Sequence, residues 1–331
     1  MPDSSEVLRT AHAALDVLMA CRRGHQAPTP GDRLQIEAAH LPMLIRQIER
    51  AAPLHLVIPA FPVKSPSLRK VIGTLPDLGE RLALAFLNAL CERLRLIYPP
   101  GARLTICSDG HVFGPVLSVT DATIDGYQCG IERMIHELGG ACLETFALSQ
   151  CDELPVAEDG CYEAPREALI ARYGVPLEIV RERLLATEEG VRQFTGVLRF
   201  MLEDRQALDA GRSRSAARRL ARDAAYAVLQ RSWAWGELLA TRFPDALRLS
   251  IHPQPPASIK FGIHMLPTCN DWITPWHGVV ATDGERFELM KRHHAEALDG
   301  RLVCVDGQPS HFVVDRLPSA TSKEARRPAA C

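Results

Sequence analysis

Apolar residues recur at helical intervals near the start of the chain. Between residues 33 and 50, the apolar positions with helix-like spacing are Leu34, Ile36, Leu41, Leu44, Ile45 and Ile48. An amphipathic helix buries such a stripe against the rest of a fold. The pattern predicts helices at residues 5–22 and 33–50, so we expect an N-terminal helical segment over residues 1–50.

Short apolar runs then alternate with helical patterns. Three runs, each too short for a helix, predict strands at residues 54–58, 104–107 and 142–148. The helical patterns between them predict helices at residues 78–97 and 121–138. The first of these helices is preceded by Asp77 and carries Glu80 three residues later, which is the form of a capping box. Alternation at this spacing is typical of right-handed crossovers in a mostly parallel, Rossmann-like sheet.

The second half of the chain changes in pattern twice. Residues 160–243 are helical and rich in arginine, with one long helix expected around residues 213–242. Five short runs after them predict strands at residues 247–251, 259–263, 278–282, 287–290 and 302–305. We therefore expect an α/β fold, in which a mostly parallel sheet is flanked by helices, with a helical segment and a mixed C-terminal part of the sheet. The α/β domain, including the helical segment at residues 160–243, would span residues 51–317, followed by a loose tail at residues 318–331.

The composition narrows the class of protein. The chain has 331 residues, 47% hydrophobic and 24% charged, which is enough for a buried core and typical of a globular protein. The formal net charge of −2 lacks the basic excess that nucleic-acid binding needs. No stretch approaches the roughly 18 apolar residues of a membrane span, and the acidic N-terminus has no targeting signal. We expect a protein that binds neither nucleic acids nor membranes.

Cysteine usage indicates a reducing compartment. None of the ten cysteines forms a CxxC pair. Cys91 lies in a helical pattern and Cys107 in a strand pattern, where cysteine acts as a small apolar residue. We therefore expect reduced thiols and a cytoplasmic location.

The loop after the first predicted strand has the composition of an anion site. Pro59, Pro62 and Pro66 stiffen it, and it then presents Lys64, Ser65, Ser67, Arg69 and Lys70. Only five of the 38 basic residues are lysines, and two of them lie here. In parallel α/β sheets, ligands bind beyond the carboxyl ends of the strands. The loop could hold a phosphate ester, or it could be a solvated connection.

Further polar residues follow other predicted strands. Asp109 comes directly after the second strand, where Asp-Gly could equally form a turn, and His111 could titrate near neutrality. His252, Lys260 and His277 lie near strand ends in the last third of the chain and could converge on the same site. A metal site is disfavoured because the chain has no HExxH and no close thiolate–imidazole spacing. The GxGxxG, GxxxxGK[ST] and GxSxG motifs are also missing, which disfavours nucleotide binding and α/β-hydrolase chemistry.

Four motifs in one order resemble the isocyanide (isonitrile) synthase family of PvcA-like and Dit1-like proteins. They read FPVKSPSLRKVIGTLPDLGERLAL, YPPGARLTICSDGHVF, LRLSIHPQ and TPWHGV. The likeness extends from about residue 50 to residue 310. The family pattern more often reads FPCKSPN and has a basic residue after SDG, so Val63, Ser67 and His111 depart from it in ways that bear on substrate handling.

The resemblance implies an enzyme that forms a C–N bond, of lyase or transferase type, without a metal or cofactor. Its substrates would be an aromatic amino acid, tyrosine or tryptophan, and ribulose 5-phosphate, whose C2 carbon becomes the isocyanide carbon. An iron/2-oxoglutarate oxygenase would be a possible pathway partner. The oligomeric state is not predicted.

The resemblance and the residue patterns together suggest roles for individual side chains. The candidate catalytic residues are Lys64, Asp109, His111, His252 and His277. The candidate ligands of the substrate phosphate are Ser65, Arg69, Lys70 and Lys260. Lys64 could also bind phosphate or form a Schiff base with the ketone. The contrasting hypothesis is a non-catalytic sugar-phosphate sensor, or an inactive paralogue that acts as a scaffold.

Overall fold

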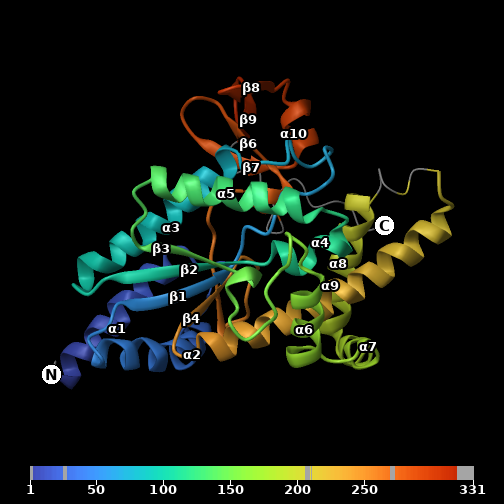
Figure 1. Cartoon of the computed structure of the whole chain (residues 1–331). Helices are drawn as coiled ribbons and strands as arrows, with labels where there is room; N and C mark the ends of the chain where they lie inside the picture. The colour runs from blue at the N-terminus through green and yellow to red at the C-terminus, as the bar shows by residue number, and fades with distance from the viewer. Residues whose placement is uncertain (1–2, 25–27, 206–208, 210, 269–272, 319–331) are drawn as a thin grey trace.

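Five parallel strands form the central sheet, in the order β3-β2-β1-β4-β5 (Figure 1). Their bounds are β1 Leu54–Pro59, β2 Ala102–Ser108, β3 Leu143–Ala147, β4 Leu247–Ser250 and β5 Lys260–Gly262. The computed structural model describes residues 3–24, 28–205, 209, 211–268 and 273–318. The prediction of a mostly parallel sheet flanked by helices is confirmed. Of the tail predicted at residues 318–331, all but residue 318 lie outside the described residues.

One face of this sheet is covered by four helices. They are α1 Ser4–Met19, α2 Pro30–Glu49, α3 Leu78–Ile97 and α5 Asp121–Glu137. Alternate residues of the strands, such as Leu56, Ile106 and Leu249, point to this side and join the largest buried apolar cluster. The two N-terminal helices therefore share a core with the sheet.

The opposite face is covered mainly by the long helix α9, Arg214–Arg242. Val57, Cys107 and Phe146 pack there against Trp235 and Leu238. Four further helices surround α9: α4 Gly110–Leu117, α6 Glu163–Tyr173, α7 Leu177–Leu185 and α8 Glu188–Arg205. The long helix expected around residues 213–242 is thus confirmed, and it forms one wall of the site described below.

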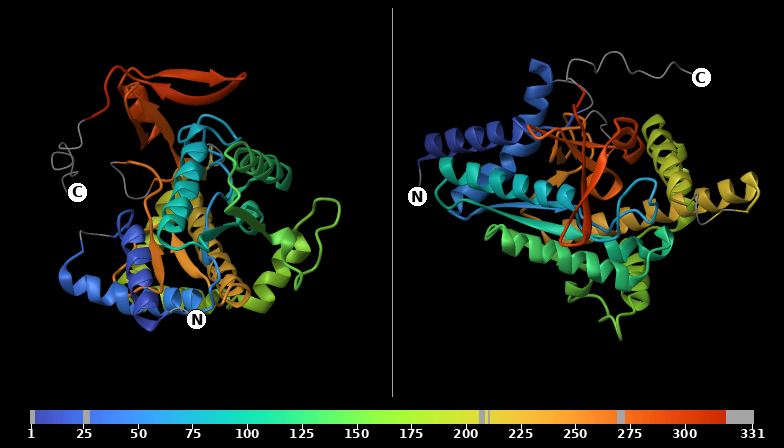
Figure 2. Two further views of the ribbon diagram at one scale, coloured as in Figure 1. Left: turned by 90° about the vertical axis from the view of Figure 1, so that its left-hand side faces the viewer. Right: turned by 90° about the horizontal axis from the view of Figure 1, so that it is seen from above.

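The last strands form a second sheet, in the order β7-β6-β9-β8, rather than a continuation of the first (Figure 2). Their bounds are β6 Val279–Thr282, β7 Phe287–Met290, β8 Arg301–Val305 and β9 Gln308–Val313, with α10 Arg292–Ala297 between β7 and β8. All four residues of β6 are buried, and Val280 packs against Leu78 and Leu82 of α3. This packing places β6 beside α3 instead of beside β5. Strand β9 was not predicted, because its sequence is interrupted by Pro309 and polar residues.

The segment after β2 also differs from the expected turn. Asp109 directly precedes helix α4, which begins at Gly110. A side chain at Gly110 would collide with the carbonyl of Pro62 and with Ile124. Glycine is therefore needed here for a close approach of the loop after β1, not for a turn.

Two general expectations can be compared with the described residues. Each cysteine in them is a free thiol. None of their helices combines the length and the apolar character needed to cross a membrane.

Candidate active site

The loop at residues 60–76, the carboxyl ends of the parallel strands and the short helix η2 (Pro275–His277) meet at one edge of the sheet. The backbone N–H of Ser65 donates to the carbonyl of Trp276 at 2.9 Å, which ties the loop to η2. Phe61, at the start of the loop, has a left-handed φ of 56° and packs its buried ring 5.1 Å from that of Trp276. A non-glycine residue in this conformation is strained, so the packing holds the loop in a defined path.

Lys64 is enclosed beneath this loop. Its ammonium lies 2.7 Å from Oδ2 of Asp77 and 2.8 Å from Oε2 of Glu80, and it donates to the carbonyl of Pro275 at 3.0 Å. An ammonium has three hydrogens, so these three acceptors use all of them. The side chain of Lys64 is 0% exposed. The structure therefore places Lys64 where it joins the loop to α3 and η2, away from any open surface.

The carboxylates around Lys64 come from the predicted capping box of α3. Oε1 of Glu80 accepts from the hydroxyl of Tyr127 at 3.1 Å, and its Oε2 accepts from the N–H of Asp77 at 3.0 Å. Burial alone would lower the pKa of Lys64, but Asp77 and Glu80 hold it above its usual value. Burial raises the pKa of Asp77 to about 7. The two carboxylates of the capping box thus also pair with the charge of Lys64, which the sequence pattern did not reveal.

Lys70 lies in a different set of contacts, with two carboxylates of α8. Its ammonium is 2.7 Å from Oδ1 of Asp204 and 3.3 Å from Oε2 of Glu203. The hydroxyl of Ser65 donates to the same Oδ1 at 2.7 Å. The Lys70 ammonium also lies 4.2 Å from the centre of the Phe200 ring. Glu203 and Asp204 were missed by the sequence analysis, because an acidic pair on a helix is usually a solvated surface.

Two histidines, His277 and His252, belong to the same site, and both are neutral. His277 is held by a 2.9 Å contact of its Nδ1 with Oγ1 of Thr274, and its ring lies 4.4 Å from that of Phe200. Burial, followed by the charges of Lys70, His252 and Lys64, brings the pKa of His277 well below its usual value. Desolvation, followed by the charges of Arg23 and Lys260, lowers the pKa of His252, and the residue is exposed at the end of β4. Both imidazoles are therefore uncharged near pH 7.

The far end of the site is positively charged. Lys260 pairs with Arg248 in the register of the parallel sheet, and Arg248 pairs with Val57 of β1. Burial lowers the pKa of Lys260, and the charge of Arg248 lowers it further, while Glu237 of α9 opposes the shift. Two cations thus face one carboxylate, which leaves a positive balance beside His252.

Asp109 and His111 diverge, although they are two residues apart. Asp109 follows β2 on the side covered by α9, and burial raises its pKa to about 7. The ring of His111 stacks on Tyr162 at 3.6 Å, and its Nε2 lies 3.0 Å from Oδ1 of Asp125. The structure therefore brings His252, Lys260, His277, Ser65 and Lys70 into one series of neighbours, whereas the His111 ring faces α5 and α6. Arg69 is exposed on the loop.

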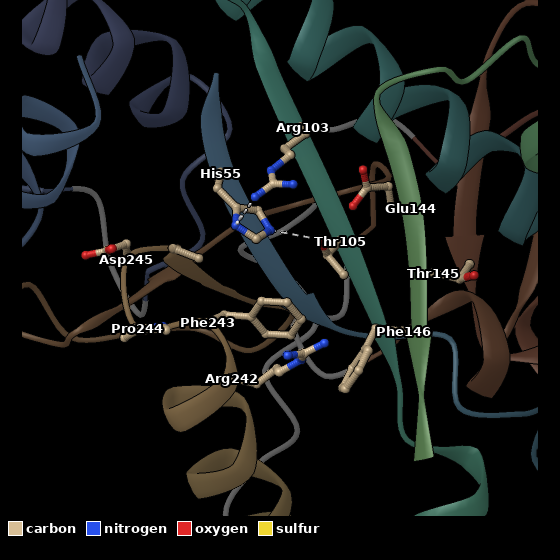
Figure 3. A pocket seen from close by; sticks show the side chains of 11 residues that line it. His55, Arg103, Thr105, Glu144, Thr145, Phe146, Arg242, Phe243, Pro244 and Asp245 are labelled. Carbon is tan, nitrogen blue, oxygen red and sulfur yellow. Dashed lines mark hydrogen bonds between the residues drawn. The ribbon is translucent and has the colours of Figure 1, made fainter. Parts of the chain in front are cut away.

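A pocket of about 380 Å³ lies elsewhere, at the amino ends of the parallel strands (Figure 3). There, Nε2 of His55 contacts Oγ1 of Thr105 at 2.9 Å, and the rings of Phe146 and Phe243 form one wall. The pocket contains none of the site residues predicted from the sequence. It also lies at the sheet edge opposite to the one where parallel α/β proteins bind ligands. Across the part of the chain that is described, no three His, Cys, Asp or Glu side chains are grouped as a metal site requires.

The fold and the strand-end site define an α/β protein with a polar site between a parallel sheet and a long covering helix. The sequence pattern of the pyoverdine/dityrosine biosynthesis protein family (DIT1_PvcA) matches residues 44–303. The chain belongs to this family, so the resemblance inferred from its motifs is confirmed.

Similar proteins match nearly the whole chain. It is 47% identical to an L-tyrosine isonitrile synthase of Pseudomonas aeruginosa, over 91% of this chain and 90% of that protein. It is 40% identical to the L-tryptophan isonitrile synthase AmbI2 of Fischerella ambigua, over 86% and 84% of the two chains. The crystal structure of the PvcA protein from Pseudomonas aeruginosa superposes with a TM-score of 0.85 at 44% identity, covering 92% of this chain and 99% of that one.

Proposed function

We propose that the protein is an isonitrile synthase, which converts the α-amine of an aromatic L-amino acid to an isocyanide. The observation that carries this proposal is the likeness, over about nine-tenths of both chains, to a protein named L-tyrosine isonitrile synthase. Relatives named L-tryptophan isonitrile synthases are also at least 39% identical. Tyrosine and tryptophan are therefore the two substrates to test.

The source of the additional carbon is proposed to be C2 of ribulose 5-phosphate, in a reaction that needs no metal or redox cofactor. This part of the proposal comes from the family likeness of the FPVKSPSLRK and SDGHVF motifs. The amine attacks the ketone, its proton passes to a base, and loss of water leaves an imine. Later fragmentation would release the remaining sugar carbons and phosphate, as a lyase or transferase type of reaction.

Proton transfer is assigned to groups that can change charge near pH 7 or are neutral there. Neutral His277 and His252 can accept a hydrogen bond from the reacting amine, and their lowered pKa values make them weak bases. Asp109, whose pKa burial raises to about 7, can hold or release a proton at the end of β2. Because the Lys64 ammonium is enclosed by three acceptors, we assign it a positioning role instead of a catalytic one or a Schiff base.

The phosphate is assigned to the positive end of the site, at Lys260 and Arg248, and Arg69, which is exposed on the loop, stays a further candidate. Lys70 and Ser65 were expected to bind phosphate, but both donate to Asp204. A dianion beside Asp204 and Glu203 would be repelled by their charges. The family likeness leaves an iron/2-oxoglutarate oxygenase as the proposed consumer of the product.

The test is an incubation of the purified protein with ribulose 5-phosphate and either tyrosine or tryptophan, followed by mass spectrometry of the product. An isocyanide formed from one of the two amino acids supports the proposal. Thermal stabilisation by ribulose 5-phosphate without product from either amino acid would instead support the sugar-phosphate sensor. Substitution of Lys260 by methionine is expected to raise the KM for ribulose 5-phosphate.

A further inference from the structure

One carboxylate oxygen in the site is buried and unused. Asp204 is 2% exposed, and its Oδ1 accepts from both Ser65 and Lys70. Its Oδ2 has no hydrogen-bond partner among the residues that the structure describes. Buried polar atoms are almost always paired, so an orphaned carboxylate oxygen requires an explanation.

Glu80 shows what a purely structural carboxylate looks like in this protein. It is equally buried, and both of its oxygens have partners: Tyr127 on Oε1, and Lys64 with the N–H of Asp77 on Oε2. Asp204 differs only in having one oxygen left over. The comparison indicates that Oδ2 of Asp204 is kept for a donor that the described part of the polypeptide does not supply.

The charge around Asp204 selects the kind of donor. Lys70 carries one positive charge, and Asp204 and Glu203 carry two negative charges within 3.3 Å of its ammonium. This end of the site is therefore one charge negative and attracts a cation. The Lys260 end has the opposite balance, so the site has two poles that suit the ammonium of one substrate and the phosphate of the other.

The position of Asp204 joins it to the proposed reaction centre. Phe200 lies one helical turn before Asp204 on α8, so the two side chains share a face of that helix. The Phe200 ring contacts both the Lys70 ammonium and the His277 ring. A donor bound at Oδ2 would thus lie on the same side of α8 as the Phe200 ring that contacts His277.

We infer that Oδ2 of Asp204 binds the α-ammonium of the amino-acid substrate, with Lys70 and Ser65 as positioning residues that hold the carboxylate. The inference rests on the proposed function. The ammonium transfers one proton to the carboxylate, giving a neutral amine and a carboxylic acid, and the amine lone pair is then free to attack the ketone. Burial raises the pKa of Asp204, against the opposing effects of Lys70 and Ser65, which favours this proton uptake.

The test compares Asp204→Asn with Glu188→Gln, which removes an exposed carboxylate at the start of the same helix. Asn keeps the shape but loses the charge, so we expect the Kd for L-tyrosine or L-tryptophan, measured by calorimetry with ribulose 5-phosphate present, to rise by about 10- to 100-fold. The KM for ribulose 5-phosphate should change much less. Glu188→Gln should leave amino-acid binding within about threefold, because that carboxylate is exposed and does not contact Lys70 or Asp204.

Several results would overturn the inference. They are unchanged amino-acid binding in Asp204→Asn, an equal loss in Glu188→Gln, or a rise confined to the sugar KM. Asp204→Glu keeps the charge and should bind the amino acid better than Asp204→Asn. If Asp204→Asn does not fold, the test uses Asp204→Glu alone. That variant must then be folded and bind the amino acid more weakly than the wild type, or the inference fails. If the wild type forms the isocyanide and Asp204→Asn binds the amino acid equally well, only the inference about Asp204 fails. If the wild type forms no isocyanide from either amino acid, the proposed function fails.

Discussion

Nζ of Lys64 lies 2.7 Å from Oδ2 of Asp77, and both side chains are almost completely shielded from solvent. Asp77 also accepts the N–H of Gly79 as the N-cap of α3. One carboxylate therefore starts a helix and anchors the loop that carries Ser65 and Lys70. The geometry of the site depends on this buried ion pair, even though protein acceptors already use all three hydrogens of the Lys64 ammonium.

Removal of Lys64 should therefore weaken the fold. Lys64→Met leaves Asp77 and Glu80 buried without their counter-charge, which typically costs about 3–5 kcal/mol. The free energy of unfolding in urea at pH 7 measures this loss. Arg81→Met removes the exposed pair with Glu137, and it should cost no more than about 1 kcal/mol. Similar losses in the two variants would contradict the assigned role.

The Tyr127 hydroxyl should matter for the same cluster. Tyr127→Phe removes the donor to Oε1 of buried Glu80, and we expect a loss of about 1–3 kcal/mol in unfolding free energy. Tyr173→Phe is the matched control, since its hydroxyl makes only a 3.5 Å contact with Glu153 at a half-buried position. If the control loses as much as Tyr127→Phe, the buried hydrogen bond is not the cause.

Two histidine variants distinguish a residue of the proposed site, His277, from a residue outside it, His111. His277→Phe should lower kcat by about 100-fold or more, because it removes a neutral imidazole beside Lys70. His111→Phe keeps the ring that stacks on Tyr162, so its kcat and both KM values should stay within about threefold of the wild type. Steady-state kinetics with both substrates checks this pair. A loss at His111 as large as that at His277 would return His111 to the catalytic group.

Asp109 should make the stability of the folded protein decrease as the pH rises. Its pKa is raised from 3.8 to about 7 in the folded protein, so the folded state binds more protons than the unfolded state in that interval. Its contribution to stability therefore falls as the pH rises from about 4 to 7. The melting temperature should fall less steeply between pH 4 and 7 in Asp109→Asn than in the wild type. The exposed Asp152→Asn should leave the slope unchanged; equal slopes in all three proteins would contradict the raised pKa.

The sequence predicted the elements whose signals are local. The buried strand β1, the capping box of α3 and the long helix α9 were all found, because apolar runs, caps and helical periodicity are set by neighbouring residues. The contacts of Asp204 could not be predicted, since Ser65 lies 139 residues away along the chain. Nor could the sequence separate Asp109 from His111, because their side chains diverge only once α4 begins at Gly110.

The most direct test of the central claim uses ribulose 5-phosphate labelled with carbon-13 at C2. The labelled sugar is incubated with the full-length protein and tyrosine, or tryptophan, and the product is examined by carbon-13 NMR and mass spectrometry. The label is expected in the isocyanide carbon attached to the former α-amine nitrogen. An unlabelled isocyanide would contradict the proposed carbon source, and no isocyanide from either amino acid would contradict the proposed function itself.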